Sequence, residues 1–177
     1  IGIVIKQDIL ENLANVVYLG IGSNLGNKRL NIELTKNEIN NSKIKILKSS
    51  SLYETKSWPD SSKPRFINII LKIRTSLPPL KLINYLQAVE IKLGRVKSKK
   101  NAPRICDIDI IDYNHQILLG QNKYNLILPH PAMTKRNFVL IPLFEISKNW
   151  KHPQNGANIV DLINLLKTED LRSIKLI

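Results

Sequence analysis

The order in which strand-like and helix-like segments alternate is the feature that most narrows the folds open to this chain. Two segments, residues 28–40 and 80–93, carry apolar side chains at helical spacing. Four others have the apolar, β-branched character of strands: residues 16–21, 44–55, 66–75 and 106–113. The resulting order is strand, helix, strand, strand, helix, strand. It predicts an α+β fold, a ferredoxin-like βαββαβ sandwich with a mainly antiparallel sheet and both helices packed on one face.

Beyond the last of these strands the pattern is less regular, and we expect a C-terminal extension of the core. It predicts an edge hairpin in residues 116–128, one or two short helices in residues 133–146 and a further helix in residues 159–166. Residues 1–15 carry no motif and stay unassigned. A chain of 177 residues is long enough for one compact domain and too short for two ordinary ones. We therefore expect residues 16–177 to form one domain.

The chain is strongly basic. It has 27 lysines and arginines against 14 aspartates and glutamates, a formal net charge of +13, which favours a nucleotide, a nucleic acid or a membrane surface as partner. A hydrophobic content of 43% argues against a disordered chain, and no apolar run is long enough to span a membrane. The one cysteine, Cys106, excludes an internal disulfide and a cysteine-based zinc site. Because the sequence also lacks a signal-peptide pattern, we expect a cytoplasmic location.

Two aspartates on the predicted strand 106–113 form the first candidate site. Asp107 and Asp109 are two residues apart, so their side chains project from one face of the strand while Ile108 and Ile110 turn to the other. Adjacent like charges cost energy unless a cation lies between them, and Mg²⁺ is commonly held by one or two carboxylates with substrate phosphates and water. One interpretation is a metal and nucleotide site. The other is a solvated pair on the open face of an edge strand.

The segment just before these aspartates is basic. Between residues 95 and 104 it has five positive charges and no acidic residue: Arg95, Lys97, Lys99, Lys100 and Arg104. Such a segment would neutralise a polyphosphate while the aspartates hold its metal ion. Arg104 is the strongest candidate, because it is nearest to the aspartates and a guanidinium binds phosphate oxygens in a bidentate way. A solvated basic loop without a ligand is the alternative.

Other motifs argue against the common nucleotide-binding folds. The glycines of residues 20–26 do not have G-x-G-x-x-G spacing and the chain has no G-x-x-x-x-G-K-[ST], so the Rossmann and P-loop classes are disfavoured. We expect these glycines to shape a turn after the first strand. The three histidines are too scattered to predict a metal cluster, and His130, within Leu-Pro-His-Pro, fits a ligand contact and a structural role equally well. Cys106 is expected to be a small core residue.

Five segments, taken in order, carry a more specific signal. Gly94-Arg95-Val96 is followed by residues 102–110 (APRICDIDI), which is similar to the signature G-R … P-R-x-x-D-[IL]-D-[IL]. The supporting segments are residues 18–25 (YLGIGSNL), 50–55 (SSLYET), 66–68 (FIN) and 128–131 (LPHP) with Arg136 and Phe138. Together they resemble the 6-hydroxymethyl-7,8-dihydropterin pyrophosphokinase family, over roughly residues 17–166.

The resemblance implies a ferredoxin-like sandwich, in agreement with the order of elements, and a reaction in folate biosynthesis. The β,γ-pyrophosphoryl group of ATP would move to the hydroxymethyl oxygen of 6-hydroxymethyl-7,8-dihydropterin, with release of AMP. The resemblance also implies that Asp107 and Asp109 hold two Mg²⁺ ions and that Arg95 and Arg104 stabilise the transferring group. The residues implied to contact ATP are Gln87, Glu90, Lys97, Lys100, Ile110, His130 and Arg136.

A pterin needs a flat slot with aromatic faces and amide-like partners for its edge. By resemblance, Phe66 and Phe138 would stack on the ring and Asn68 would bind its edge. Phe66 and Asn68 are two residues apart on a predicted strand and hence on one face, an argument that does not depend on the family. The residues implied to contact the pterin are Gly22, Thr55, Lys56, Trp58, Phe66, Asn68 and Phe138.

The chain departs from the family in the basic loop, which is a residue shorter than the common form and has Lys97 and Lys100 where arginines often occur. Two other functions stay open: a nucleic-acid-binding ferredoxin-like module, although no strand has the aromatic pattern of such modules, and a kinase of this fold that releases ADP. We expect a monomer that binds ATP and the pterin and neither nucleic acid nor membrane. A first residue other than Met, Ile1, also fits a place in a fused folate-pathway polypeptide.

Overall fold

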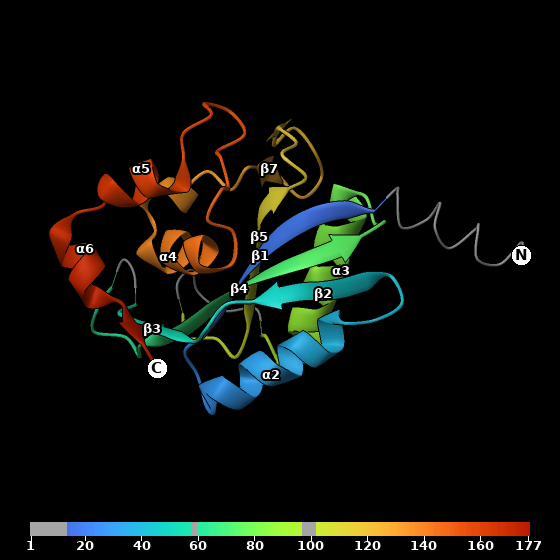
Figure 1. Ribbon diagram of the computed structural model, residues 1–177. Helices are drawn as coiled ribbons and strands as arrows, with labels where there is room; N and C mark the ends of the chain where they lie inside the picture. The colour runs from blue at the N-terminus through green and yellow to red at the C-terminus, as the bar shows by residue number, and fades with distance from the viewer. Residues whose placement is uncertain (1–13, 58–59, 97–101) are drawn as a thin grey trace, which may run out of the picture.

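The computed structural model describes residues 14–57, 60–96 and 102–177. In this part of the chain six strands form one antiparallel sheet with helices on both faces (Figure 1). The strands of the sheet are β1 (Asn15–Ser23), β2 (Ile44–Ser49), β3 (Tyr53–Thr55), β4 (Phe66–Thr75), β5 (Asp107–Tyr113) and β8 (Lys175–Leu176). A separate hairpin consists of β6 (Leu118–Leu119) and β7 (Ile127–Leu128). The helices are α2 (Lys28–Ile39), α3 (Pro79–Lys92), the 3₁₀ helix η1 (Met133–Lys135), α4 (Asn137–Ile146), α5 (Ile159–Asn164) and α6 (Thr168–Ser173).

β1 lies between β5 and β4, and β4 is the central strand of the sheet. On its other side β4 pairs with β2 along one half of its length and with β3 along the other half, and β8 then pairs with β3. The register places Gly22 of β1 opposite both Asp107 of β5 and Asn68 of β4. Three residues that are far apart in the sequence therefore lie in one row across neighbouring strands.

One face of the sheet is closed by α2 and α3 (Figure 1). From β1, the side chains of Val17, Leu19 and Ile21 point to this face and belong to one apolar cluster with Ile32 of α2 and Leu86 of α3. All five are buried. Burial of each such side chain contributes about 1.5–3 kcal/mol. The larger of the two apolar clusters lies on this face, which therefore provides most of the core.

The opposite face is covered at one end by α4 and α5 (Figure 1). The intervening strand residues Tyr18, Ile70 and Ile111 point to this side and pack with Leu140 and Trp150 in a second apolar cluster. The alternation follows from the two-residue period of a strand. Toward the ends of β1, β4 and β5 that carry Gly22, Asn68 and Asp107, the same face is hollowed into a cavity.

The mixed α/β composition and the antiparallel sheet predicted from the sequence are confirmed. The prediction of one strand over residues 44–55 is wrong, because the strand breaks at Ser50. The Ser50 hydroxyl accepts a hydrogen bond from the Ile70 N–H (2.9 Å), while the Ser50 N–H donates to the Ile70 carbonyl (2.9 Å). A side chain thus replaces one main-chain partner of β4 at that point, and the ladder resumes as β3.

Three further differences concern short or small elements. Gly20 and Gly22 lie inside β1, not in the turn after it. The helix α6 was not predicted because it buries no side chain, so its sequence has no apolar stripe. The strand β8 has two residues, too few for a periodic signal. In the described part of the chain, none of the helices is long and apolar enough to cross a membrane.

Candidate active site

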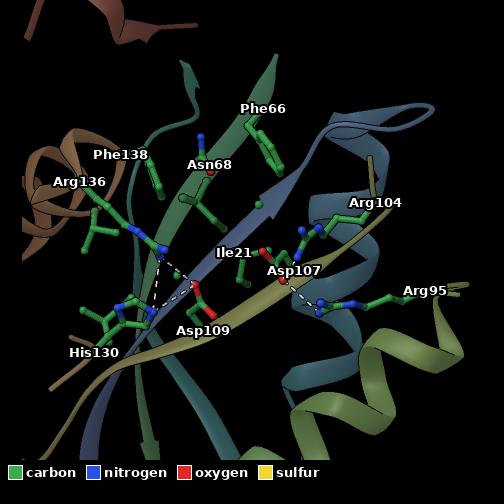
Figure 2. Close-up of a pocket in the computed structure, with 15 residues that line it drawn as sticks. Ile21, Phe66, Asn68, Arg95, Arg104, Asp107, Asp109, His130, Arg136 and Phe138 are labelled. Carbon is green, nitrogen blue, oxygen red and sulfur yellow. Dashed lines mark hydrogen bonds and ion pairs between the residues drawn. The ribbon is translucent and has the colours of Figure 1, made fainter. Parts of the chain in front are cut away.

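A cavity of about 310 Å³ opens on the second face of the sheet, beside α4 (Figure 2). Glycines of β1 form part of its wall. A Cβ atom at Gly22 would lie 3.0 Å from the Asn68 Oδ1 atom and 3.3 Å from the Phe66 Cδ1 atom, so this position needs a residue without a side chain. Ten residues predicted to act in the site line the cavity: Gly22, Phe66, Asn68, Arg95, Arg104, Asp107, Asp109, His130, Arg136 and Phe138.

The two aspartates project from β5 into this cavity, as their spacing predicts, whereas Ile108 and Ile110 are buried in the core on the other side. Desolvation and the neighbouring charge of Asp107 raise the pKa of the Asp109 carboxyl. The pair therefore fits a divalent cation, which would relieve this repulsion. No group of three or more acidic, histidine or cysteine side chains capable of holding a metal occurs among the described residues. Substrate oxygens and water would have to complete the coordination of such an ion.

Two arginines converge on one oxygen of Asp107 (Figure 2). The Nη1 atom of Arg95, which follows α3, and the Nη1 atom of Arg104, which precedes β5, each donate to Asp107 Oδ1 at 3.0 Å. Of the Asp107 side chain 28% is exposed, so this charge cluster remains open to the cavity. Two guanidinium groups beside a carboxylate can bind phosphate oxygens from one side of a metal ion.

Glu90 of α3 lies beneath this cluster and is buried. Its Oε1 atom accepts hydrogen bonds from the Arg95 guanidinium and from the Ile108 N–H (2.7 Å). Burial is the main reason why its pKa is raised to about 7. The prediction that Glu90 contacts ATP finds no support in this geometry, because its carboxylate is occupied by Arg95 and β5.

Two other residues predicted to contact ATP lie away from the cavity. Gln87 is exposed on α3 and does not line the cavity. The Ile110 side chain is 2% exposed and lies in the core on the α2 and α3 side, because it has the opposite parity to the two aspartates. The Ile110 side chain therefore does not face the cavity, and the ATP contact of Ile110 stays a prediction.

On the opposite wall of the cavity, His130 and Arg136 face Asp109 (Figure 2). The Arg136 Nη1 atom lies 3.3 Å from Asp109 Oδ2, and the His130 Nε2 atom lies 3.8 Å from the same oxygen. The His130 Nδ1 atom accepts a hydrogen bond from the Ala132 N–H (3.1 Å), which fixes the ring. Burial lowers the pKa of His130. The predicted ligand contact of His130 is thus compatible with its position.

The remaining wall is aromatic and amide in character. Phe66 and Asn68 project from β4 on one face, and Phe138 comes from the first turn of α4 (Figure 2). Asn68 is buried, and its Nδ2 atom donates to the Thr55 hydroxyl at 2.9 Å. The amide is therefore held in one orientation between two aromatic side chains, an arrangement that suits a flat heterocycle.

The other predicted pterin contacts are divided. Thr55 supports Asn68 from beneath, and with Lys56 it lines a neighbouring cavity of about 440 Å³ that shares Arg136 and Phe138 with the first. Trp58, Lys97 and Lys100 lie outside the described residues. Asn24 was not predicted to belong to the site, although its side chain contacts the main chain of Arg104. Its place in the segment 18–25 was the available signal.

Comparisons with known proteins agree with this geometry. A model of the 7,8-dihydro-6-hydroxymethylpterin-pyrophosphokinase family matches residues 18–148. The folic acid synthesis protein of Pneumocystis carinii is 39% identical over 96% of the chain, which spans 22% of that protein. The 2-amino-4-hydroxy-6-hydroxymethyldihydropteridine pyrophosphokinase of Aquifex aeolicus is 39% identical over 77% of the chain and 83% of its own length.

A solved structure shows the same fold. The wild-type HPPK-DHPS of Plasmodium falciparum with pteroate superimposes with a TM-score of 0.66 at 16% sequence identity, over 85% of this chain and 44% of that one. The family match covers the strands and loops that carry the two aspartates, the two arginines and the aromatic wall. The chain therefore belongs to the 7,8-dihydro-6-hydroxymethylpterin-pyrophosphokinase family.

Proposed function

We propose that the protein transfers the β,γ-pyrophosphoryl group of ATP to the hydroxymethyl oxygen of 6-hydroxymethyl-7,8-dihydropterin and releases AMP, a step of folate biosynthesis. The observation that carries the proposal is that one cavity has paired carboxylates with two arginines at one end and an aromatic and amide slot at the other. Membership of the family supports pyrophosphoryl transfer to the pterin as the reaction that this cavity would catalyse. The chain spans about a fifth of the first fungal relative (22%). The proposed activity is therefore that of this region and not of the whole of such a longer protein.

At the phosphate end, Asp107 and Asp109 would hold two Mg²⁺ ions, which when bound neutralise phosphate charge and polarise the phosphoryl oxygens. Arg95 and Arg104 orient the β- and γ-phosphates from the same side. The pterin hydroxyl oxygen forms a bond to the β-phosphorus, the bond from that phosphorus to the oxygen of AMP breaks, and the hydroxyl proton passes to solvent water. Because the acceptor oxygen attacks directly, catalysis rests on alignment and charge stabilisation, and no protein nucleophile is required.

The other ATP contacts are proposed to come from His130 and Arg136 beside Asp109, and from Lys97 and Lys100. Glu90 acts through Arg95, whose guanidinium it holds. Gln87 and the main chain of Ile110 are kept as proposed nucleotide contacts with no geometric support from their side chains.

At the pterin end, Phe66 and Phe138 would stack on the ring while the Asn68 amide binds its edge. Gly22 permits the close approach, and Thr55 fixes the amide through its hydroxyl. Lys56 and Trp58 are proposed to border the slot from the segment that follows β3. These assignments place the hydroxymethyl group toward the two aspartates.

We also propose that residues 16–177 form one domain of ferredoxin-like topology that acts as a monomer. The order β5-β1-β4-β2, antiparallel throughout, with α2 and α3 on one face, supports the topology. Relatives in which the matching region is about a fifth of the polypeptide support a place in a fused folate-pathway protein.

The deciding experiment is a product assay. The protein is incubated with ATP, Mg²⁺ and 6-hydroxymethyl-7,8-dihydropterin, and AMP and ADP are quantified. We expect AMP that depends on the pterin and disappears with EDTA. Formation of ADP would indicate ordinary phosphoryl transfer instead. Absence of any pterin-dependent nucleotide product, together with binding of labelled single-stranded RNA at physiological salt, would favour a nucleic-acid-binding module.

A further inference from the structure

We propose that Asn24 is a positioning residue that ties the arginine end of the cavity to its pterin end. Asn24 directly follows β1, is 3% exposed and does not line the cavity. It therefore acts on the reaction only through the residues that it holds. This inference rests on the proposed function, because it assigns the two ends of the cavity to phosphate and pterin.

The first tie is to Arg104. The Asn24 N–H donates to the Arg104 carbonyl at 3.1 Å, and the Asn24 Oδ1 atom accepts from the Arg104 N–H at 2.8 Å. Both main-chain polar groups of Arg104 are thus bound by one residue. Because the Arg104 side chain in turn donates to Asp107 Oδ1, a shift of this main chain would move a guanidinium in the proposed phosphate site.

The second tie is to the segment that enters β4. The Asn24 Nδ2 atom donates to the Pro64 carbonyl at 3.2 Å, two residues before Phe66. Lys28, the first residue of α2, donates to the next carbonyl along, that of Arg65, at 3.1 Å. The start of β4, from which Phe66 and Asn68 project, is therefore held from the end of β1.

The reach of this side chain distinguishes it from its neighbours. Asparagine side chains in turns usually bond to nearby main chain, as Asn27 does with the Leu30 N–H and Asn31 with the Leu25 carbonyl. The two polar atoms of the Asn24 side chain instead bind segments 80 and 40 residues away. A cap for its own turn would not need either bond, so the geometry points to a link between the two segments.

Two substitutions separate the two ties. Asn24→Asp keeps an oxygen to accept from the Arg104 N–H but replaces the donor to Pro64 with a second acceptor. Asn24→Ala removes both side-chain bonds. Asn31→Ala is the matched control, because within the described residues the Asn31 side chain donates to the Ser23 hydroxyl and the Leu25 carbonyl, both nearby in the chain, and bonds to neither distant segment.

Each variant is assayed for pterin-dependent AMP formation and, without ATP, for pterin binding by fluorescence titration. We expect Asn24→Asp to raise the pterin Kd about fivefold with little change in kcat, and Asn24→Ala also to lower kcat about tenfold. Asn31→Ala should keep kcat and Kd within about twofold, although it unfolds at a lower temperature. Unchanged kcat and Kd in Asn24→Ala, or equal changes in Asn31→Ala, would overturn the proposal.

A double-mutant cycle tests whether Asn24 acts through Arg104. In an Arg104→Ala background, Asn24→Ala should lower kcat by no more than about twofold further, because the side chain it positions is gone. A full tenfold further loss would show a general structural role and contradict the proposal. If Asn24→Ala does not fold, the cycle is run with Asn24→Ser.

Hydrogen exchange tests the contact between Asn24 and Arg104 independently of the proposed function. The Arg104 amide should exchange about tenfold faster in Asn24→Ala than in the unsubstituted protein, and the Arg104 amide in Asn31→Ala should not. If the unsubstituted protein forms no AMP, the proposed function fails while this comparison still decides whether the tie exists. Equal exchange of the Arg104 amide in Asn24→Ala and in the unsubstituted protein would refute the contact between Asn24 and Arg104.

Discussion

On β5, Ile108 and Ile110 point into the core beneath α2 and α3, whereas Asp107 and Asp109 point into the cavity on the other side of the sheet. The same holds for β1, where Leu19 is buried in the core and the neighbouring Gly20 borders the cavity. One face is closed by two helices along these strands, and the other is covered at one end only.

The difference shows that stability and chemistry are separated by single residues along the same strand. At this end of the strands, residues that turn toward α2 and α3 are buried in the core, while the residues between them border the cavity. Substitutions on the cavity face should therefore change activity with little loss of stability, and substitutions on the helix face should do the reverse. The following predictions test that separation, from the largest effect to the smallest.

The sharpest test is to remove either cavity aspartate. Asp107→Ala and Asp109→Ala should each lower AMP formation on the order of 10³-fold, because the proposed metal ions lose a ligand. Thermal unfolding should be nearly unchanged, since neither side chain belongs to the core. The counterpart is Ile108→Ala, which should cost about 2–5 kcal/mol of unfolding free energy and leave the specific activity of the folded protein within a few fold. Near-normal turnover in both aspartate variants would end the metal-site proposal.

Arg104→Ala should have the next largest effect. We expect turnover to fall on the order of 10²-fold, because a charge-assisted contact to the transferring group is lost. The pterin Kd should change less than threefold, since Phe66, Asn68 and Phe138 form the other wall. Steady-state kinetics with a parallel binding titration separates the two quantities. A larger change in Kd than in kcat would place Arg104 in the pterin site instead.

The next prediction concerns the pH dependence of the unfolding free energy and Glu90, which lies between the core and the charged groups of the cavity. Because burial raises its pKa from 4.5 to about 7, the folded state binds this proton more tightly than the unfolded state. The contribution is fully present below about pH 4.5 and is lost as pH rises through 7, on the order of 1–3 kcal/mol of unfolding free energy.

Urea unfolding at pH 5 and pH 8 measures the Glu90 contribution. In Glu90→Gln the difference between the two pH values should shrink, because glutamine does not titrate. Glu33→Gln, at an exposed glutamate of α2 paired with Lys36, is the control and should keep the difference found for the unsubstituted protein. An unchanged difference in Glu90→Gln would show that another group governs this range.

The smallest expected effect is that of Gly22→Ala. The added methyl group would press on Asn68 and Phe66, so the pterin Kd should rise about tenfold. Gly156→Ala is the control, since a methyl group there would meet nothing within 4 Å beyond its chain neighbours and the residue does not line the cavity. It should lower the unfolding temperature only, through its positive φ of 69°. Equal pterin binding in both variants would contradict a pterin slot beside Gly22.

Much of the fold followed from local pattern. The alternation of Asp107, Ile108 and Asp109 predicted which side chains share a face. The helical spacing of apolar residues in 80–93 predicted α3, which is confirmed and which buries Leu82, Leu86 and Val89. The residues of the cavity were predicted largely through family motifs, and ten of them meet there. Elements without periodicity, such as α6 and β8, gave no signal.

Other features depend on contacts between distant segments. The break at Ser50 depends on its bonds to Ile70, and the orientation of Glu90 depends on Arg95 and the Ile108 N–H. No local pattern reports such partners, because a side chain that could face solvent, a ligand or another strand has the same sequence signature in each case. For the same reason Asn24 had no predicted role beyond its place in the turn expected at residues 20–26.

The sequence by itself determined the order of the main elements and, where the alternation is regular, the face to which strand residues turn, because both follow from periodicities of two and 3.6 residues. Only the tertiary structure decided that Gly22 lies between Asp107 and Asn68, since strand register depends on pairing between segments that are distant in the chain. That register brings the two carboxylates and the aromatic and amide wall into one cavity.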